Sequence, residues 1–543
     1  MVAAAERAEL HKTIWRIAND LRGSVDGWDF KSYVLGFLFY RFISENLTDY
    51  LNEKERQAIL EDGGSQEEAD SFDFATLSNE EAEPGRAATV ADKGFFIRPT
   101  DLFGYVRARA KGNENLNEQL AGIFRAIEDS AKGTNAEADL RGLFDDVDVN
   151  SSKLGNTVAE RNAKLVKIMD AVGDLPLDHG SAQIDAFGDA YEYLMGMYAA
   201  NAGKSGGEYY TPQEVSELLA KIAMDGRDAE QIRTVYDPAC GSGSLLLKVK
   251  RELGKNSDGL RFVGQEINLT TYNLCRINMF LHNVNFANFD IALGDTLTAP
   301  AHWDDQPFDA IVSNPPYSTK WVGKDDMALV NDPRFSSAGV LAPSSKADLA
   351  FTMHMLHWLA EDGTAAIVEF PGVLYRGGAE GKIRRYLVEN NFVHTIIQLP
   401  PDLFFGTTIA TCIIVLKKSR VDDKVLFVDA SSQFVREGNK NRLNEENREH
   451  LLSLAFERKD VEHVAKLVSI DNIAANDWNL SVSSYVEPED TREKVDIAEL
   501  NNRIAGIVER QQQLRESIDA IVAELEADQL VNTASDDDSR EGE

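Results

Sequence analysis

Apolar residues at three- and four-residue spacing predict helices in the first part of the chain. The spacing runs through residues 10–51, where Gly23 separates two halves, and it returns over residues 116–127 and 158–172. Such spacing places apolar side chains on one face of a helix, and that face can then pack into a core. The sequence therefore predicts a mostly helical N-terminal domain over residues 1–165.

From about Thr234 the pattern changes to short apolar runs separated by helical stretches. Runs of this length that alternate with helices are typical of βαβ units, in which helices cover both faces of a parallel sheet. We therefore expect an α/β catalytic domain with a Rossmann-like fold over residues 166–485. The runs expected to form strands are residues 234–236, 262–263, 291–293, 310–312, 365–370, 395–399 and 411–416.

The last apolar pattern has the alternating three- and four-residue steps of a coiled coil, and only Gln511 is polar in it. Two interpretations stay open, because such a helix can pack back on its own domain or pair with a partner's helix. We predict a C-terminal helix for subunit docking over residues 486–528, followed by an acidic disordered tail over residues 529–543. We call the patterned positions the C-terminal seam: Ile497, Leu500, Ile504, Ile507, Gln511, Leu514, Ile518, Ile521 and Leu525.

Composition narrows the class of protein. A chain of 543 residues with 43% hydrophobic residues is long and apolar enough for two or three domains with cores. It has no run of about 18 apolar residues, and acidic Glu6 and Glu9 stand where a signal peptide would be apolar, so we expect a cytoplasmic protein without membrane contact. The cysteines Cys240, Cys275 and Cys412 lie far apart without CxxC spacing, which indicates reduced core residues and no metal site.

The net charge of −34 comes from 56 Lys and Arg against 90 Asp and Glu. Binding of duplex DNA depends on Lys and Arg at the phosphates. A chain this acidic is therefore expected to bind DNA poorly unless its basic residues cluster or a partner supplies them.

A glycine-rich turn follows the first predicted strand. It reads Asp237-Pro238-Ala239-Cys240-Gly241-Ser242-Gly243 and precedes a helix-competent run, so its backbone can approach a ligand near free N–H groups. Turns of this kind also occur without any ligand, and this one lacks the Lys of a P-loop. Glu266 and Asp295 end the next two predicted strands, and the three strand ends together predict one crevice at the carboxyl edge of the sheet. Glu266 is placed to accept hydrogen bonds from ribose hydroxyls.

The tetrapeptide Asn314-Pro315-Pro316-Tyr317 follows the fourth predicted strand. The prolines restrict the backbone, so the Asn314 side-chain oxygen and the Pro315 carbonyl can both accept from one planar NH2 group. Tyr317 can stack on the ring that carries this amine. Two acceptors on its hydrogens favour the form of the amine that attacks a sulfonium methyl group. A plain proline turn at a strand end is the alternative.

The order of these motifs resembles the γ arrangement of amino-methyltransferases, and Glu208-Tyr209-Tyr210-Thr211-Pro212-Gln213 resembles their first cofactor motif. From about Ala8 to Leu525 the chain is similar to the modification (M, HsdM) subunit of type I restriction-modification systems, particularly the IC-like group. Further segments that carry this resemblance are Leu21-Arg22-Gly23, residues 33–42 and 200–212, Ala347-Asp348-Leu349-Ala350-Phe351, residues 371–377 and Leu403-Phe404-Phe405-Gly406.

The resemblance implies a site-specific adenine methyltransferase that uses S-adenosylmethionine to methylate N6 of adenine in double-stranded DNA. It places the methionine end of S-adenosylmethionine at residues 208–213 and 241–243, the ribose at Glu266 and the adenine ring at Asp295, with Asp237 in the same cofactor site.

The resemblance assigns the target adenine to the Asn314-Pro315-Pro316-Tyr317 tetrapeptide. The base would be flipped out of the duplex and received by Tyr317. Direct transfer is expected, with no metal and no covalent enzyme intermediate, so Cys240 is not expected to act as a nucleophile.

The resemblance also implies partners. A specificity subunit would choose the DNA site, two copies of this chain would join it in an M2S1 assembly, and a restriction subunit would complete the complex. The C-terminal seam is the expected docking surface for the specificity subunit. The charge of −34 then fits a division of labour in which another subunit finds the DNA site.

Two alternatives stay open. A protein-glutamine N5 methyltransferase shares the Asn-Pro-Pro-Tyr site, because a side-chain amide also presents a planar NH2 group, but such chains are much shorter. The other alternative is a non-catalytic scaffold subunit that binds DNA within a larger complex. The intact residues from Asn314 to Tyr317 argue against a scaffold.

Overall fold

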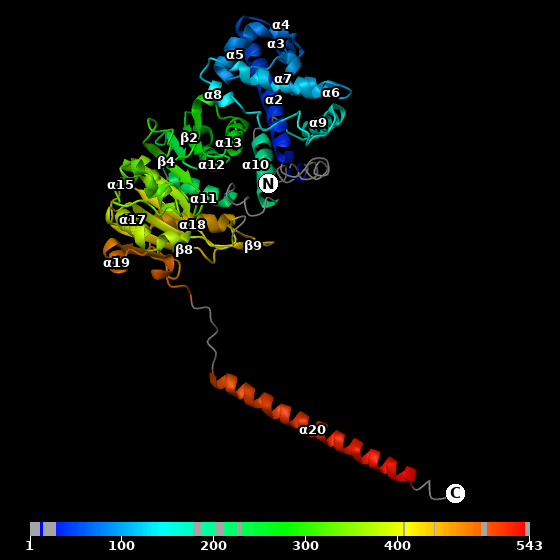
Figure 1. Ribbon diagram of the computed structural model, residues 1–543, viewed down its shortest axis with the longest axis vertical. Coiled ribbons are helices and arrows are strands. Elements are labelled where there is room, and N and C mark those ends of the chain that lie inside the picture. The colour runs from blue at the N-terminus through cyan, green and yellow to red at the C-terminus, as the bar shows by residue number, and fades with distance from the viewer. Residues whose placement is uncertain are drawn as a thin grey trace. The chain divides into compact units, whose positions relative to one another are not determined.

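A nine-stranded mixed sheet organises the larger part of the chain (Figure 1). The chain consists of two compact units, Met1–Pro488, which we call the body, and Glu489–Glu543, the C-terminal unit. The computed structural model describes residues 11, 12, 14, 29–177, 186–201, 211–224, 227, 230–257, 259–404, 408–438, 440–489 and 497–537.

The strand order of the sheet is β11-β8-β6-β7-β5-β4-β1-β2-β3. Neighbouring strands from β3 to β5 run parallel, whereas β7 is antiparallel to β5 and β6, and β11 is antiparallel to β8. The strands are β1 Thr234–Asp237, β2 Arg261–Glu266, β3 Phe289–Leu293, β4 Phe308–Ser313, β5 Leu359–Glu369, β6 Val393–Gln398, β7 Cys412–Lys417, β8 Lys424–Asp429 and β11 Ala465–Ser469, with β9 Val435–Glu437 and β10 Lys440–Arg442 in a separate antiparallel pair.

The α/β fold and the seven predicted strands are confirmed, but the expectation of a wholly parallel sheet was wrong at β7. An apolar run that is buried on both faces has the same composition whichever way the strand runs. Direction is decided by the connection instead, and here the chain leaves β6 and returns beside it as β7. Strands β8 and β11 were not predicted.

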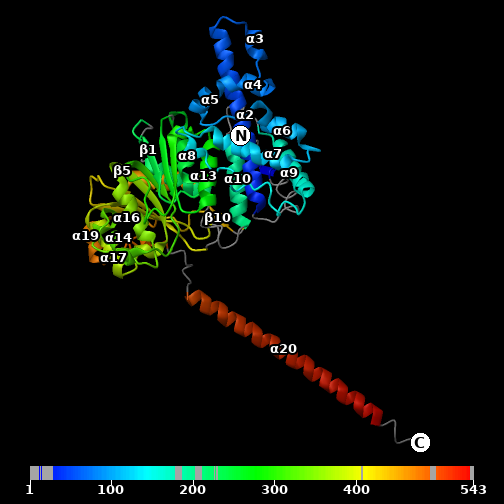
Figure 2. The ribbon, with the colours of Figure 1, turned by 45° about the horizontal axis from the view of Figure 1, so that its top comes forward.

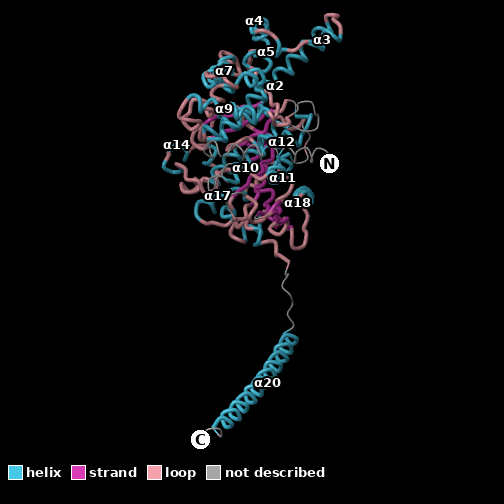
Figure 3. Tube along the Cα trace, turned by 90° about the vertical axis from the view of Figure 1, so that its right-hand side faces the viewer, coloured by secondary structure: helices cyan, strands magenta, loops and turns pink. Residues whose placement is uncertain are grey.

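Alternate side chains of the strands enter two separate apolar clusters. Val235 and Val312 belong to one cluster, and their neighbours Tyr236 and Ile311 belong to the other, because successive side chains of a strand point to opposite faces. Figure 3 shows the strands in the interior with helices around them. The first face is covered by α10 Ala186–Asn201, α11 Gln213–Met224, α12 Ser244–Leu253, α13 Leu269–Leu281 and α18 Glu445–Glu457, and the second by α14 Met327–Val330, α15 Pro333–Ser336, α16 Asp348–Trp358, α17 Gly378–Glu389 and α19 Ile470–Ala475.

Residues 29–177 contain helices and no strand, which confirms the helical N-terminal region. Helix α9 begins at a capping box in which Thr157 and Glu160 satisfy each other's backbone N–H groups. Apolar side chains of this region belong to the same cluster as the first face of the sheet, and α13 packs against α2 (Figure 2). The helices are α2 Asp29–Glu61, α3 Gln66–Ser71, α4 Asn79–Ala82, α5 Arg86–Lys93, α6 Phe103–Ala110, α7 Leu116–Ser130, α8 Glu137–Leu140 and α9 Val158–Gly173.

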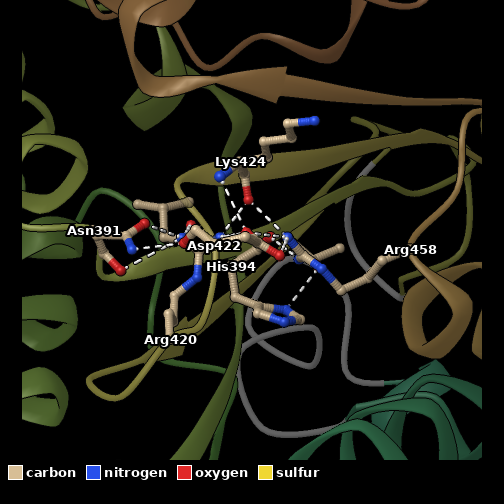
Figure 4. A network of polar contacts seen from close by, with 8 residues as sticks. Asn391, His394, Arg420, Asp422, Lys424 and Arg458 are labelled. Atoms are coloured by element: carbon tan, nitrogen blue, oxygen red, sulfur yellow. Dashed lines mark hydrogen bonds and ion pairs between the residues drawn. The ribbon is translucent and has the colours of Figure 1, made fainter.

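An arginine network joins the C-terminal end of α18 to the first residues of β6 and β8 (Figure 4). Arg458 donates to the His394 carbonyl at 2.8 Å, to the Lys424 carbonyl at 2.7 Å and to Asp422 at 3.0 Å. Arg420 donates to the same carboxylate at 3.0 Å. Burial and the neighbouring Arg458 lower the pKa of Arg420 to about 10. The network therefore supplies donors to backbone carbonyl groups where β6 and β8 begin.

The C-terminal unit contains the 41-residue helix α20 Ile497–Asp537. The helix extends past residue 528, so the disordered tail does not begin where the sequence suggested. No Pro or Gly interrupts residues 529–537, and the helical hydrogen bonds can therefore continue. The rest of the expected tail lies outside the described residues. None of the described helices is both long and apolar enough to span a membrane.

Candidate active site

The glycine turn after β1 is held close to α13. Gly241 and Gly243 have φ values of 55° and 76°, in the left-handed region that favours glycine. A Cβ at Gly243 would lie 2.8 Å from Cys275 Sγ and 2.9 Å from Met279 Cε. Asn278 on the same helix donates to the Ser242 carbonyl at 2.9 Å. The structure therefore gives Gly243 a packing reason: a side chain at this position would collide with α13.

Asp237 connects the glycine turn to β4. One of its oxygens accepts from the Ala239 N–H at 3.0 Å and from the Ser313 hydroxyl at 2.8 Å. Its other oxygen is buried without a partner among the described residues. Burial raises the pKa of Asp237 to about 7. Because Ser313 immediately precedes Asn314, this bond links the two predicted motifs across the paired strands β1 and β4.

Glu266 and Asp295 lie at the ends of β2 and β3, where the sequence placed them. Glu266 accepts from the Gly241 N–H at 3.1 Å and from the Asn268 N–H at 2.8 Å, one bond on each oxygen, and burial raises its pKa. Asp295 accepts from the Leu297 N–H and the Thr298 hydroxyl, both at 2.9 Å. A carboxylate oxygen can accept more than one bond, so both groups keep acceptor capacity for a ligand.

A cavity of about 480 Å³ opens at this edge of the sheet. This volume lies within the range of small-molecule sites. Five of the predicted site residues line the cavity: Gly241, Glu266, Asp295, Asn314 and Pro316. The cofactor half and the target half of the predicted site are thus brought together in one space.

Several lining residues were missed by the sequence interpretation, among them Ile267, Trp321 and Phe351. Ile267 is 68% exposed although it is strongly apolar. Its position directly after Glu266 was a usable signal, because a side chain just beyond a strand end projects into the crevice. Trp321 and Phe351 lie on a loop and on α16, whose approach to the crevice depends on tertiary packing.

The Asn314-Pro315-Pro316-Tyr317 segment has its own internal contacts. The Asn314 amide donates to the Thr211 hydroxyl at 3.1 Å, and the Tyr317 hydroxyl donates to the Asn314 side-chain oxygen at 2.6 Å. The Tyr317 ring meets Phe404 edge to face at 6.5 Å, and burial raises the Tyr317 pKa well above its usual value. The Asn314 oxygen expected to accept from an amine therefore accepts from Tyr317 in this structure.

The described part of the first cofactor motif lies behind the cavity wall. Thr211 orients the Asn314 amide, and the Pro212 carbonyl accepts from the Val215 and Ser216 N–H groups at the start of α11. Gln213 donates to Glu192 at 2.9 Å and does not line the cavity. Glu208, Tyr209 and Tyr210 lie outside the described residues.

The three cysteines are buried and do not line the cavity. Cys240, Cys275 and Cys412 are all buried, as the sequence predicted, and the Cys240 and Cys275 sulfur atoms are 3.9 Å apart. Their hydrogen bond and burial raise the pKa of Cys240 well above its usual value. A thiol held neutral in this way is a poor nucleophile.

The sheet with its reversed β7, together with the crevice beyond its carboxyl edge, defines the class of Rossmann-like methyltransferases. The chain matches the N-6 DNA methylase family over residues 182–494 and the HsdM N-terminal domain over residues 10–172.

Individual relatives agree with this class. The chain is 47% identical to the methylase subunit of the type I restriction enzyme MpnII from Mycoplasma pneumoniae, over 96% of this chain and 97% of that one. It is 29% identical to the MjaVIII methylase subunit from Methanocaldococcus jannaschii, over 87% and 77% of the two chains. The fold matches the crystal structure of the type I restriction-modification methyltransferase subunit from Streptococcus thermophilus with a TM-score of 0.79 at 36% identity, over 89% of this chain and 100% of that one.

The chain belongs to the methylase subunits of type I restriction-modification systems, and it is the modification subunit of such a system. The resemblance predicted from the sequence motifs is thereby confirmed.

Proposed function

We propose that this subunit transfers a methyl group from S-adenosylmethionine to N6 of adenine in double-stranded DNA, at sites chosen by a specificity subunit. One observation carries the proposal: Asn314 and Pro316 line the same cavity as Glu266 and Asp295. A methyl donor held by the acids and an amine held at Asn314 can therefore meet without either leaving its half of the site.

The described residues fit S-adenosylmethionine. Glu266 has acceptor capacity for ribose hydroxyls, and the exposed side chain of Ile267 offers apolar surface to a flat ring. The turn at Gly241 lets the backbone approach the ligand without a side chain between them. When bound, S-adenosylmethionine would supply a methyl group activated by its positive sulfur.

The acceptor side of the reaction follows from the contacts of Asn314. Thr211 holds the amide nitrogen, so the side-chain oxygen keeps its direction when Tyr317 releases it. The Asn314 oxygen and the Pro315 carbonyl then accept from the exocyclic amine, while the freed ring of Tyr317 stacks on the base. The amine nitrogen gains the methyl group, the bond from that carbon to sulfur breaks, and one amine proton leaves to solvent.

Partner subunits complete the proposal. The chain carries a net charge of −34, which opposes binding to DNA unless another subunit provides basic contacts. The exposed apolar seam of α20 offers a docking surface for helices of the specificity subunit. We propose an M2S1 assembly of two such subunits with one specificity subunit, which a restriction subunit joins in the complete system.

Reconstitution tests this function directly. The purified chain is incubated with tritiated S-adenosylmethionine and plasmid DNA, with and without its specificity subunit, and methylated adenines are mapped by sequencing. We expect the chain alone to bind S-adenosylmethionine. We expect methylation of adenine at a specific DNA sequence only when the specificity subunit is present. Robust site-specific methylation by the chain alone would contradict the division of labour.

A parallel reaction with a glutamine-containing peptide tests the alternative substrate. Transfer of label to the peptide and none to DNA would favour the protein-glutamine methyltransferase. No transfer to either substrate by the complete complex would favour the scaffold.

A further inference from the structure

Two buried carboxyl groups lie behind the wall of the cavity. Asp348, the first residue of α16, is 1% exposed, and Glu369, the last residue of β5, is fully buried. Asp348 Oδ1 accepts from the Ser318 N–H at 3.0 Å, and Glu369 Oε1 accepts from the Thr352 hydroxyl at 2.8 Å. The second oxygen of each group, Oδ2 and Oε2, has no partner among the described residues. Two half-satisfied acids at such depth need an explanation.

The bond from Ser318 to Asp348 holds the turn that directly follows Tyr317. Ser318 has a φ of 52°, in the left-handed region that a serine adopts only when its surroundings impose it. One residue further along each segment, the Ala347 N–H donates to the Thr319 carbonyl at 2.8 Å. Ala347 and Thr319 both line the cavity. Asp348 and Ala347 therefore hold Ser318 and Thr319, the two residues that directly follow Tyr317, at the start of α16.

No cation among the described residues balances Glu369. The titratable groups that face it are Asp348 from α16, Tyr317 from the loop after β4, Glu380 from α17 and Cys412 from β7. Glu380 is itself paired with Arg376 at 3.3 Å. Two buried carboxylates without a cation cannot both be ionised at low cost. Burial, reinforced by Asp348, raises the pKa of Glu369 to about 8.

We propose that Asp348 and Glu369 are positioning residues for methyl transfer: Asp348 anchors the turn through its bond from the Ser318 N–H, and a proton on Glu369 keeps a second negative charge away from that anchor. This inference rests on the proposed function. Loss of the Glu369 proton places an uncompensated buried charge beside Asp348, weakens the Ser318 anchor and displaces Tyr317. Methyl transfer by this subunit is then limited on the alkaline side by a residue that never touches the substrate.

The test follows the rate of methyl transfer by the reconstituted complex, at saturating substrates, from pH 6.5 to pH 9.5. An acid with a pKa of about 8 is about nine-tenths protonated at pH 7 and about one-tenth protonated at pH 9, so the wild-type rate should fall about tenfold between these values. Glu369→Gln keeps the shape of the neutral acid and cannot titrate, so its rate should fall less than about twofold.

Two further variants sharpen the measurement. Thr352→Val removes a hydrogen bond that favours the charged form of Glu369, so the alkaline fall should move to higher pH. Glu128→Gln is the matched control, because Glu128 is another carboxyl group whose pKa is raised by burial but lies on α7 in the N-terminal region. It should keep the wild-type pH profile. An alkaline fall shared by wild type and Glu369→Gln would overturn the inference and leave the proposed function intact.

Thermal unfolding examines the pair without any methyl transfer. The folded-state pKa of Glu369 is raised, so its contribution to stability is complete below the unfolded pKa of about 4.3 and is lost as the pH rises through about 8. The wild-type melting temperature should therefore fall more between pH 6 and pH 9 than that of Glu369→Gln. Equal falls would overturn the inference. If the wild-type complex methylates no adenine at any pH but the melting temperatures still differ in this way, the proposed function is contradicted and the inference about the carboxyl pair is not.

Discussion

The apolar residues that are regularly spaced in the sequence are buried in the body but exposed on the C-terminal helix. The apolar positions of the strands are enclosed in two clusters, one on each face of the sheet. On α20 the eight apolar residues of the seam are between 45% and 72% exposed. A long helix gains little stability in water without packing its apolar face. The body encloses its own apolar positions, whereas the apolar face of α20 is not covered within the C-terminal unit.

Asn314→Ala should have the largest effect, because it removes a proposed catalytic group of the body while leaving the fold intact. Loss of the proposed acceptor for the target amine should lower the rate of methyl transfer on the order of 100- to 1000-fold. Binding of S-adenosylmethionine, measured by calorimetry, should stay within about threefold of wild type, since Glu266 and Asp295 are unchanged. Asn472→Ala, at an exposed position of α19, is the control. A transfer rate above a tenth of wild type would show that Asn314 is not the amine acceptor.

Leu514→Asp tests the exposed apolar seam of α20. A charge in the centre of the seam should weaken binding to the specificity subunit on the order of 30-fold, as measured by calorimetric titration. Docking of the seam on a partner subunit predicts an unchanged melting temperature for the isolated chain. Gln513→Asp, one position outside the seam, should bind normally. A lower melting temperature for Leu514→Asp would show instead that the helix packs back on its own body.

Arg458→Met should have the smallest effect and should be confined to the stability of the body. It removes donors from the His394 and Lys424 carbonyls and one partner from Asp422. Asp422 is half exposed, so solvent screening limits the loss to about 1 to 2 kcal/mol of unfolding free energy, measured by urea denaturation. Arg385→Met, which breaks an exposed pair with Glu389, should cost less than about 0.5 kcal/mol. Equal losses in the two variants would show that the network adds no stability.

The parts of the site that follow strand ends were predictable, and the parts that depend on contacts between distant segments were not. Glu266, Asp295 and Asn314 stand at the ends of strands that the apolar runs reveal, so their common edge could be inferred. The bond from Tyr317 to Asn314 was not predicted, because it depends on the rotamers of a loop. Gln213 was assigned to the cofactor, yet its amide turns towards Glu192 on a helix that sequence spacing does not relate to it.

The sequence by itself determined the class of chemistry, the helical N-terminal region and the alternation of strands and helices, because these depend on residue type and on local periodicity. Only the tertiary structure decided the direction of β7, the shared cavity and the placing of Asp348 behind the turn after Tyr317. Those features join segments that are remote along the chain, and their geometry is set by packing. The buried carboxyl pair shows the difference most clearly, since neither Asp348 nor Glu369 is unusual until the fold removes both from water.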